Sequence, residues 1–277
     1  MAGTELAEVF RATRAEGRAA LIGYLPAGFP TVEASTRTLS AMVAGGCDLV
    51  EVGVPFSDPV LDGAVIQAAA ETARSNGFRL RDTFAMVERV TAAGGRAVVM
   101  TYYNPILAYG VDRFARDLAA AGGLGVITPD LIVDEAQPWL SATAAHGLDP
   151  IFLVAPSSSA ERISMTAART SGFLYAASTM GVTGARDQVS SSAPALVARC
   201  RELTDLPIGV GLGVRTGAQA AQIAAFADAV IVGSAFVSAA MTDPIAVANL
   251  AEELAAGVRA SNAGSTPAAT STVAGAR

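Results

Sequence analysis

Short apolar runs rich in β-branched residues alternate along the chain with longer segments whose apolar side chains recur every three or four positions. The short runs are typical of buried strands, and the longer segments are typical of helices that bury one face. The pattern predicts eight strands, at residues 19–25, 49–54, 97–100, 124–127, 151–154, 173–176, 208–210 and 229–232.

A helical segment follows each predicted strand, and one more amphipathic helix, at residues 5–16, precedes the first strand. Glycines commonly end these segments, as expected of residues that adopt the helix-stop conformation without strain. The predicted helices after the strands span 31–45, 65–75, 80–91, 111–121, 135–146, 160–170, 188–201, a segment ending near 225, and 244–256.

Strands that alternate with helices lie parallel, and eight such units predict a (β/α)8 TIM barrel with an extra N-terminal helix. An open doubly wound sheet is the alternative. The 277 residues, 52% of them hydrophobic, suffice for one large core. We expect a single TIM-barrel catalytic domain over residues 1–260. Residues 261–277 lack apolar periodicity and are predicted to form a disordered tail.

The stretch DLVEVGVPFSDPVLDGAVIQ, residues 48–67, places two carboxylates near the end of a predicted strand. Glu51 lies within an apolar run, where a charged side chain needs a partner or a task. Burial would raise its pKa toward the range of a general acid and base, whereas the alternative is a structural carboxylate paired with a neighbour. In the proline-stiffened loop that follows, Asp62 is the second candidate, and Asp58 is expected to cap a turn.

In a barrel of this kind, the loops that follow the strands share one face, and catalytic groups come from the strand ends. Asp130, within the turn sequence TPD, is expected to be structural or to contact another subunit. The polar residues gathered on this face are Glu51, Asp62, Tyr102, Asn104, Asp130, Tyr175 and Thr183.

The last three loops of that face are rich in small residues, namely Gly181 and Gly184, Gly211 and Gly213, and Gly233 and Ser234. Glycine lets backbone N–H groups approach a phosphate closely, and the helix starts behind these loops favour an anion. We therefore predict a phosphate site there. The GVGLGV stretch lacks the spacing of a dinucleotide-binding loop.

Composition and charge exclude several classes of function. The net charge is −6 and the basic residues are scattered, so we expect no nucleic-acid partner. Cys47 and Cys200 are expected to be reduced, buried thiols, and His146 is the only histidine, which argues against a metal site or a histidine-based triad. The N-terminus does not resemble a signal peptide, and no apolar run is as long as the roughly 18 residues that a membrane span needs, so a cytoplasmic protein without a membrane role is predicted.

Several stretches resemble the tryptophan synthase α-subunit family over residues 6–255. They are EVGVPFSDPVLDG, YYNP, ITPDL, FLVAPSSS, YAASTMGVTG, GVGLGV and IVGSAF. The resemblance implies a carbon–carbon lyase that cleaves indole-3-glycerol phosphate into indole and glyceraldehyde 3-phosphate. It also implies that Glu51 protonates indole C3 and deprotonates the side-chain hydroxyl, that Asp62 accepts the indole N–H, and that Tyr175 lies near the reacting centre.

The resemblance further implies how the substrate is held. Thr183 belongs to a lid loop and is expected to meet Asp62 when the site closes. The expected phosphate contacts are Gly184, Gly213, Gly233 and Ser234, and the expected indole pocket is formed by Tyr24, Met100, Ile127, Leu212 and Val232. The chain itself is expected to need no metal and no organic cofactor. Pyridoxal phosphate belongs to a β subunit that receives indole within an αββα heterotetramer.

Two positions depart from the family pattern. Ala64 and Val133 stand where the family commonly has proline, and both loops lie on the face expected to meet the β subunit. Three other readings remain at this point: a stand-alone lyase that releases free indole, a partner-binding subunit without catalysis, and another phosphate-sugar barrel such as an isomerase. The intact Glu51, Asp62 and Tyr175 argue against a subunit without catalysis. The EVGVPFSDP stretch argues against another phosphate-sugar barrel.

Overall fold

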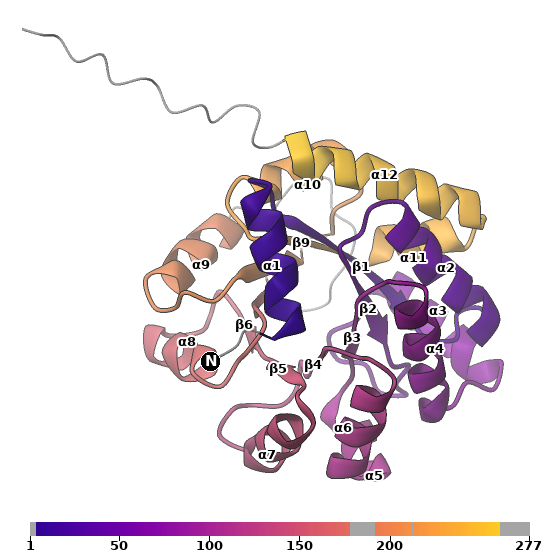
Figure 1. Cartoon of the computed structure of the whole chain (residues 1–277), viewed down its shortest axis with the longest axis horizontal. Helices are drawn as coiled ribbons and strands as arrows, with labels where there is room; N and C mark the ends of the chain where they lie inside the picture. Colours follow the sequence, from indigo (N-terminus) through magenta and orange to yellow (C-terminus); the bar gives the residue numbers. More distant parts are fainter. Residues whose placement is uncertain (1–3, 178–191, 212, 261–277) are drawn as a thin grey trace, which may run out of the picture.

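The computed structural model describes residues 4–177, 192–211 and 213–260, and its strands form one sheet in which every pairing is parallel. The order in the sheet is β5-β4-β3-β2-β1-β9-β8-β7-β6, with helices around the outside (Figure 1). The strands are β1 (Ala20–Pro26), β2 (Leu49–Gly53), β3 (Ala97–Met100), β4 (Gly125–Ile127), β5 (Asp149–Ile151), β6 (Leu153–Val154), β7 (Leu174–Ala177), β8 (Ile208–Gly211) and β9 (Ala229–Val232).

One interrupted strand closes the sheet into a barrel. β5 and β6 occupy the two ends of the strand order but are separated in sequence only by Phe152. β5 pairs with β4, and β6 pairs with β7. The single strand predicted at 151–154 is therefore this pair, beginning two residues earlier, and the predicted TIM barrel is confirmed over the open sheet.

The helices confirm the predicted alternation, with two additions. α5 and α11 are only seven residues each, too short for apolar periodicity to show. The helices are α1 (Glu5–Ala15), α2 (Val32–Ala44), α3 (Ala64–Ser75), α4 (Leu80–Ala92), α5 (Tyr103–Tyr109), α6 (Val111–Ala120), α7 (Gln137–His146), α8 (Ala160–Ala167), α9 (Ser192–Arg201), α10 (Gly217–Ala224), α11 (Ser234–Ala240) and α12 (Pro244–Ala260). The predicted start of α9 at residue 188 and the predicted tail at 261–277 lie outside the described residues.

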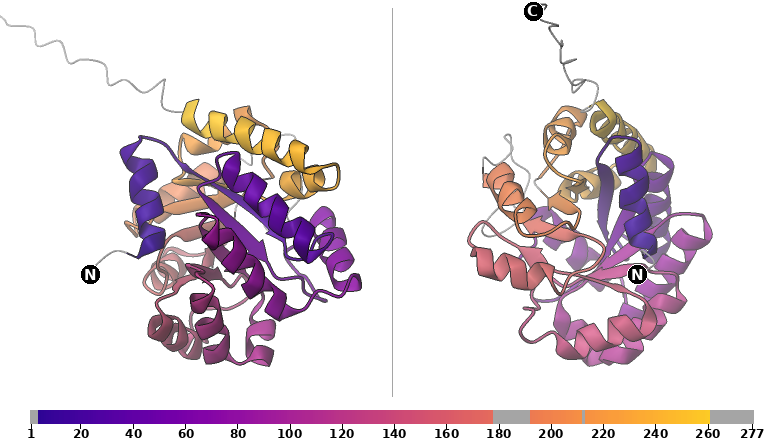
Figure 2. Two further views of the ribbon diagram at one scale, coloured as in Figure 1. Left: turned by 45° about the vertical axis from the view of Figure 1, so that its right-hand side comes forward. Right: turned by 60° about the vertical axis from the view of Figure 1, so that its left-hand side comes forward.

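The extra N-terminal helix α1 closes the amino-terminal end of the barrel. Its Leu6 and Phe10 are buried in one cluster with inward-facing residues of most strands, among them Ile22 and Val98. The Phe10 ring lies 5.4 Å from that of Phe173, centroid to centroid. α1 thus fills the end of the barrel opposite the loops that follow the strands (Figures 1 and 2).

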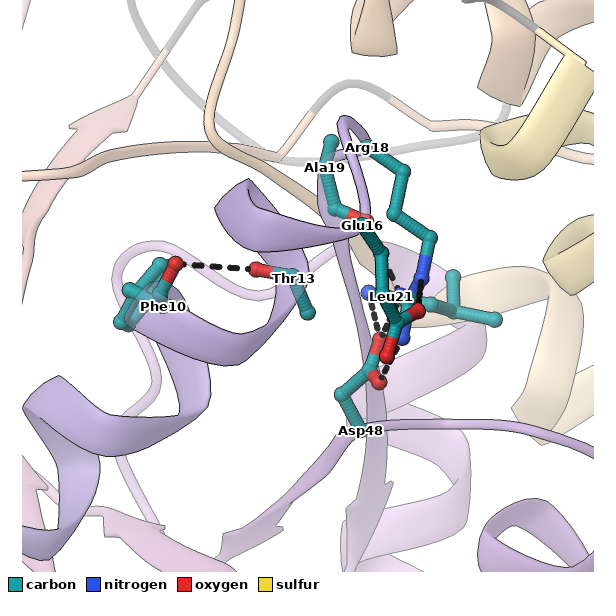
Figure 3. A network of polar contacts seen from close by, with 7 residues as sticks. All are labelled: Phe10, Thr13, Glu16, Arg18, Ala19, Leu21 and Asp48. Atoms are coloured by element: carbon teal, nitrogen blue, oxygen red, sulfur yellow. Dashed lines mark hydrogen bonds and ion pairs between the residues drawn. The ribbon is translucent and has the colours of Figure 1, made fainter.

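A bidentate ion pair ties the connection between α1 and β1 to the start of β2 (Figure 3). The Arg18 guanidinium donates to both carboxylate oxygens of Asp48, at 2.8 Å each, and Asp48 also accepts the Leu21 backbone N–H at 2.8 Å. Both side chains are largely buried, so this pair is screened less by solvent than a surface pair. It supports the register that places Glu51 beside Tyr24.

The last helix, α12, returns along the outside of the barrel to lie beside α2 and α10 (Figure 2). α10 and α12 approach so closely that a Cβ on Gly257 would lie 2.1 Å from the Gly217 carbonyl oxygen. Glycine in a helix interior costs roughly 0.5–1 kcal/mol relative to alanine, so this contact requires glycine in spite of its helix propensity.

We predict that Gly257→Ala lowers the free energy of unfolding by about 1–3 kcal/mol, because the backbone carbonyl cannot move aside and the two helices must separate. Equilibrium urea unfolding measures the change. The exposed neighbouring change Ala256→Ser serves as the control and should alter stability by no more than roughly 0.5 kcal/mol. A Gly257→Ala variant as stable as the parent would contradict this account of the α10–α12 contact.

Candidate active site

Glu51 points into the barrel from the middle of β2. Its neighbours in the sheet are Tyr24 on β1 and Val98 on β3. Leu49, two positions earlier and therefore on the same face of the strand, belongs to the cluster that fills the barrel interior. The Glu51 side chain is only 1% exposed, so the sheet holds a carboxyl group inside an otherwise apolar structure.

This environment changes the acidity of Glu51. Its Oε2 is buried and has no hydrogen-bond partner among the described residues. Burial, with a smaller contribution from the negative charge of Asp62, raises the pKa of Glu51 from 4.5 to about 8. The carboxyl group is therefore protonated at neutral pH and close to the point at which it can release its proton.

Asp62 supplies the second carboxylate from the loop between β2 and α3. It is half-buried, and burial raises its pKa from 3.8 to about 6. Its backbone carbonyl accepts a hydrogen bond from the Gln67 side chain at 2.8 Å, which fixes the end of the loop to the first turn of α3. At neutral pH the two carboxyl groups thus differ, because Asp62 is mostly ionised and Glu51 is mostly neutral.

Two tyrosines lie close to both carboxyl groups. Burial raises the pKa of Tyr24 and Tyr175 well above the usual value, and the charges of Glu51 and Asp62 raise both further. Glycines make room for the two rings. A Cβ on Gly53 would lie 2.4 Å from the Tyr24 hydroxyl oxygen, and a Cβ on Gly211 would lie 2.6 Å from the Tyr175 hydroxyl oxygen.

The structure brings most of the expected indole pocket to this end of the barrel, with one exception. Met100 is half-buried and Ile127 is fully buried, and both contact the interior cluster. Val232 instead packs in the layer between barrel and helices, because it has the same parity along β9 as Val230. The interior-facing residue there is Ile231, which sequence pattern did not distinguish from its neighbour. Leu212 lies outside the described residues.

The candidate phosphate residues that the structure describes follow two neighbouring strands. β8 and β9 pair, so Gly213 and Gly233 continue from adjacent strand ends. Gly213 has φ +63°, a conformation that favours glycine. Gly233 is the N-cap of α11, and Ser234 begins that helix and is buried. The other two candidates in this part of the face, Thr183 and Gly184, lie outside the described residues.

The remaining polar candidates have structural contacts. The Asp130 carboxylate accepts the Tyr103 backbone N–H, at 2.9 and 3.2 Å, at the start of α5. Asp58 accepts a hydrogen bond from Ser57 in its own turn. His146 pairs with Asp112, its Nε2 lying 2.9 Å from a carboxylate oxygen.

Two further features concern metals and sulfur. Cys47 and Cys200 are free and buried, as the sequence predicts. Within the described ranges, no three His, Cys, Asp or Glu side chains cluster in a way that could hold a metal ion.

Comparison with known proteins gives a consistent result. The family model described as tryptophan synthase alpha chain matches residues 10–264. The tryptophan synthase alpha chain of Mycobacteroides abscessus is 64% identical over 254 residues, covering 92% of this chain and 97% of that protein. The Nocardia farcinica protein of the same name is 64% identical over 262 residues, covering 95% and 98%. A structure of Mycobacterium tuberculosis tryptophan synthase is similar with a TM-score of 0.90 at 61% identity, covering 93% of this chain and 99% of that one.

The buried carboxyl group generates a stability prediction. Glu51 has a higher pKa in the folded chain than when exposed, so ionisation destabilises the fold as pH rises from 4.5 to 8. Glu51→Gln cannot ionise. Its free energy of unfolding relative to the parent should therefore increase across this pH range, by up to about 5 kcal/mol. Urea unfolding at several pH values measures the difference.

The same change at the exposed Glu33, Glu33→Gln, is the control for replacing a glutamate on the surface. A difference between Glu51→Gln and the parent that stays constant from pH 5 to pH 8.5 would mean that the Glu51 pKa is not raised.

Proposed function

The chain belongs to the tryptophan synthase alpha chain family, and we propose that the carboxyl-terminal face of its barrel is the catalytic site. It is a lyase of tryptophan biosynthesis that cleaves indole-3-glycerol phosphate into indole and glyceraldehyde 3-phosphate, and the indole passes to a β subunit. The observation that carries the site assignment is the pair of carboxyl groups, Glu51 and Asp62, whose environments leave one neutral and the other ionised at pH 7.

Glu51 is the proposed acid and base. Its neutral carboxyl donates a proton to indole C3, which makes the ring an electron-poor indolenine. The resulting carboxylate then takes the proton of the hydroxyl on the carbon attached to C3. As the O–H electrons form the aldehyde C=O, the carbon–carbon bond breaks and its electron pair returns to the ring, releasing indole. Both protons are accounted for, and Glu51 ends in its starting state.

Asp62 is proposed to accept the indole N–H. Protonation of C3 places positive charge on the ring nitrogen, and an ionised carboxylate at that position stabilises the charge as it develops. The pKa of about 6 supports this role, because the group is ionised at pH 7. Tyr24, Met100 and Ile127 would then contact the indole ring, and Tyr175 would lie beside the reacting carbon.

The phosphate is proposed to bind the backbone N–H groups of Gly213, Gly233 and Ser234, supported by the start of α11. Gly184 would complete this set, and Thr183 would close over the site toward Asp62. None of these steps requires a metal or an organic cofactor, because the indolenine accepts the electron pair. Pyridoxal phosphate would belong to the β subunit.

An apolar surface on the same face suits the partner. Val60, Leu107 and Ile132 expose 66%, 54% and 57% of their surface on the loops or short helix that follow β2, β3 and β4. We propose that they contact the β subunit in an αββα assembly.

The two positions where the family commonly has proline, Ala64 and Val133, lie on this face. Ala64, at the first position of α3, would accommodate the family's proline without a change in helix geometry, and Val133 packs against the core from its loop.

We also propose a cytoplasmic location. In the part of the chain that the structure describes, no helix has both the length and the apolar character of a membrane span.

The decisive experiment is indole release from indole-3-glycerol phosphate by the purified chain, with and without a β subunit from a close relative. Weak release that rises strongly with the β subunit is the expected result. Fast release that is indifferent to the partner would identify a stand-alone lyase. No release under either condition would leave a binding-only subunit.

Glu51→Gln should lower turnover of indole-3-glycerol phosphate at least ~10²-fold, because glutamine can neither donate nor accept the transferred proton. Asp62→Asn should be severely impaired, since a neutral amide does not stabilise the positive ring. Asp58→Asn, in the same loop, is the matched control and should retain turnover of the isolated chain. Parent-like turnover by either test variant, with the fold intact by circular dichroism, would refute the role of that residue.

The pH dependence of kcat/KM should be bell-shaped. Activity should fall below about pH 6, where Asp62 gains a proton, and above about pH 8, where Glu51 loses the proton that it donates to C3. Steady-state assays of the isolated chain from pH 5 to pH 9.5 measure the profile. A profile that keeps rising above pH 8 would indicate that the unprotonated form of Glu51 begins the reaction.

A further inference from the structure

The hydroxyl of Tyr102, just beyond the end of β3, binds the loop that carries Asp62. It accepts hydrogen bonds from the backbone N–H groups of Val60 and Leu61, each at 3.0 Å. Tyr102 is only 6% exposed. The two donors directly precede Asp62 in the chain, so the hydroxyl fixes the backbone next to the catalytic carboxylate.

The Tyr102 ring contacts the other half of the same loop. Its centroid lies 5.0 Å from that of Phe56, with the planes 30° apart. Residues 55–59, which include two prolines, make no backbone-to-backbone hydrogen bond with any residue that the structure describes. One side chain, which follows the neighbouring strand β3, therefore contacts both halves of a loop that has little regular structure of its own.

The backbone next to Tyr102 is fixed by contacts with the loop after β4 and with α7. The backbone N–H of the following residue, Tyr103, donates to the carboxylate of Asp130, which lies in the loop after β4. The Tyr103 ring packs edge-on against the buried Trp139 of α7, 6.4 Å between centroids. The loops after β2, β3 and β4 are thus connected in series, with Tyr102 between a fixed anchor and Asp62.

We infer that Tyr102 is a positioning residue for the lyase reaction, acting through Asp62. This inference rests on the proposed role of Asp62. Asp62 must meet the indole N–H of a ring held by strand residues, and a misplacement of about 1 Å at such a contact can cost ~10²-fold in rate. Glu51 and Tyr175 sit on strands and need no such support, whereas Asp62 sits on a loop.

The location of Tyr102 also predicts what it does not affect. It follows β3, whereas the candidate phosphate residues follow β8 and β9. Three strands lie between β3 and β8 in one direction around the barrel and four in the other. Loss of the hydroxyl should therefore lower kcat with little change in the binding of a phosphate anion.

Tyr102→Phe tests the inference, because it keeps the ring against Phe56 and removes only the shared acceptor. Indole release should fall roughly 10- to 100-fold in kcat, while inhibition by inorganic phosphate stays within about twofold of the parent. The acid limb of the pH profile, which belongs to Asp62, should also move. The matched control is Tyr103→Phe, which should leave kcat and the acid limb unchanged.

A double-mutant cycle separates positioning from a general loss of structure. In an Asp62→Asn background the further effect of Tyr102→Phe should nearly vanish, since the group that it positions is already absent. Hydrogen exchange should show faster exchange in residues 56–63 of Tyr102→Phe and unchanged exchange in the barrel strands.

Three results would overturn the inference: parent-like kcat in Tyr102→Phe, an equal additional loss in the Asp62→Asn background, or a loss of exchange protection throughout the barrel. A parent chain without lyase activity would instead contradict the proposed function. A fully active Asp62→Asn variant would contradict the role of Asp62. Both results differ from the three that overturn the role of Tyr102.

Discussion

The burial of Glu51 within β2 is the constraint on which the rest of the active site depends. A carboxyl group that is 1% exposed loses most of its hydration, and its pKa rises to about 8 because the ionised form is penalised. That penalty makes the group a proton donor at neutral pH, which an exposed glutamate is not. The surrounding barrel must therefore be rigid and dry, and its stability must come from parts that take no part in the chemistry.

Those parts lie mainly at the opposite end of the molecule. α1 fills the amino-terminal opening with Leu6 and Phe10, and the Arg18–Asp48 pair fixes the first two strands where they begin. The free-energy cost of burying the Glu51 carboxyl group is offset by close packing elsewhere, as in the α10–α12 contact at Gly257. Such separation of stabilising and catalytic ends is characteristic of this barrel architecture.

Within the site, rigid and adaptable elements carry different tasks. Strands hold Glu51, Tyr24 and Tyr175, whose places are fixed by register and by the glycines that admit the two tyrosine rings. A loop holds Asp62, whose place depends on contacts from neighbouring elements, chiefly Tyr102 and Gln67. A carboxylate on a loop can respond to a bound ring or to a partner subunit in a way that a strand residue cannot.

Local pattern alone was sufficient to predict the barrel, the N-terminal helix, and the candidacy of Glu51 and Asp62, because hydrophobic periodicity and a charge within an apolar strand are short-range signals. Closure through β5 and β6, the short helices α5 and α11, and the choice of Ile231 over Val232 as the inward residue were decided only by the tertiary structure. Strand alternation repeats every two residues, so a sequence shows that one of two neighbours faces inward but not which one. The tertiary structure also decided how far the pKa values of Glu51 and Asp62 rise, and that Tyr102 supports the loop of Asp62. Burial and contacts between loops arise from residues that only the folded chain brings together.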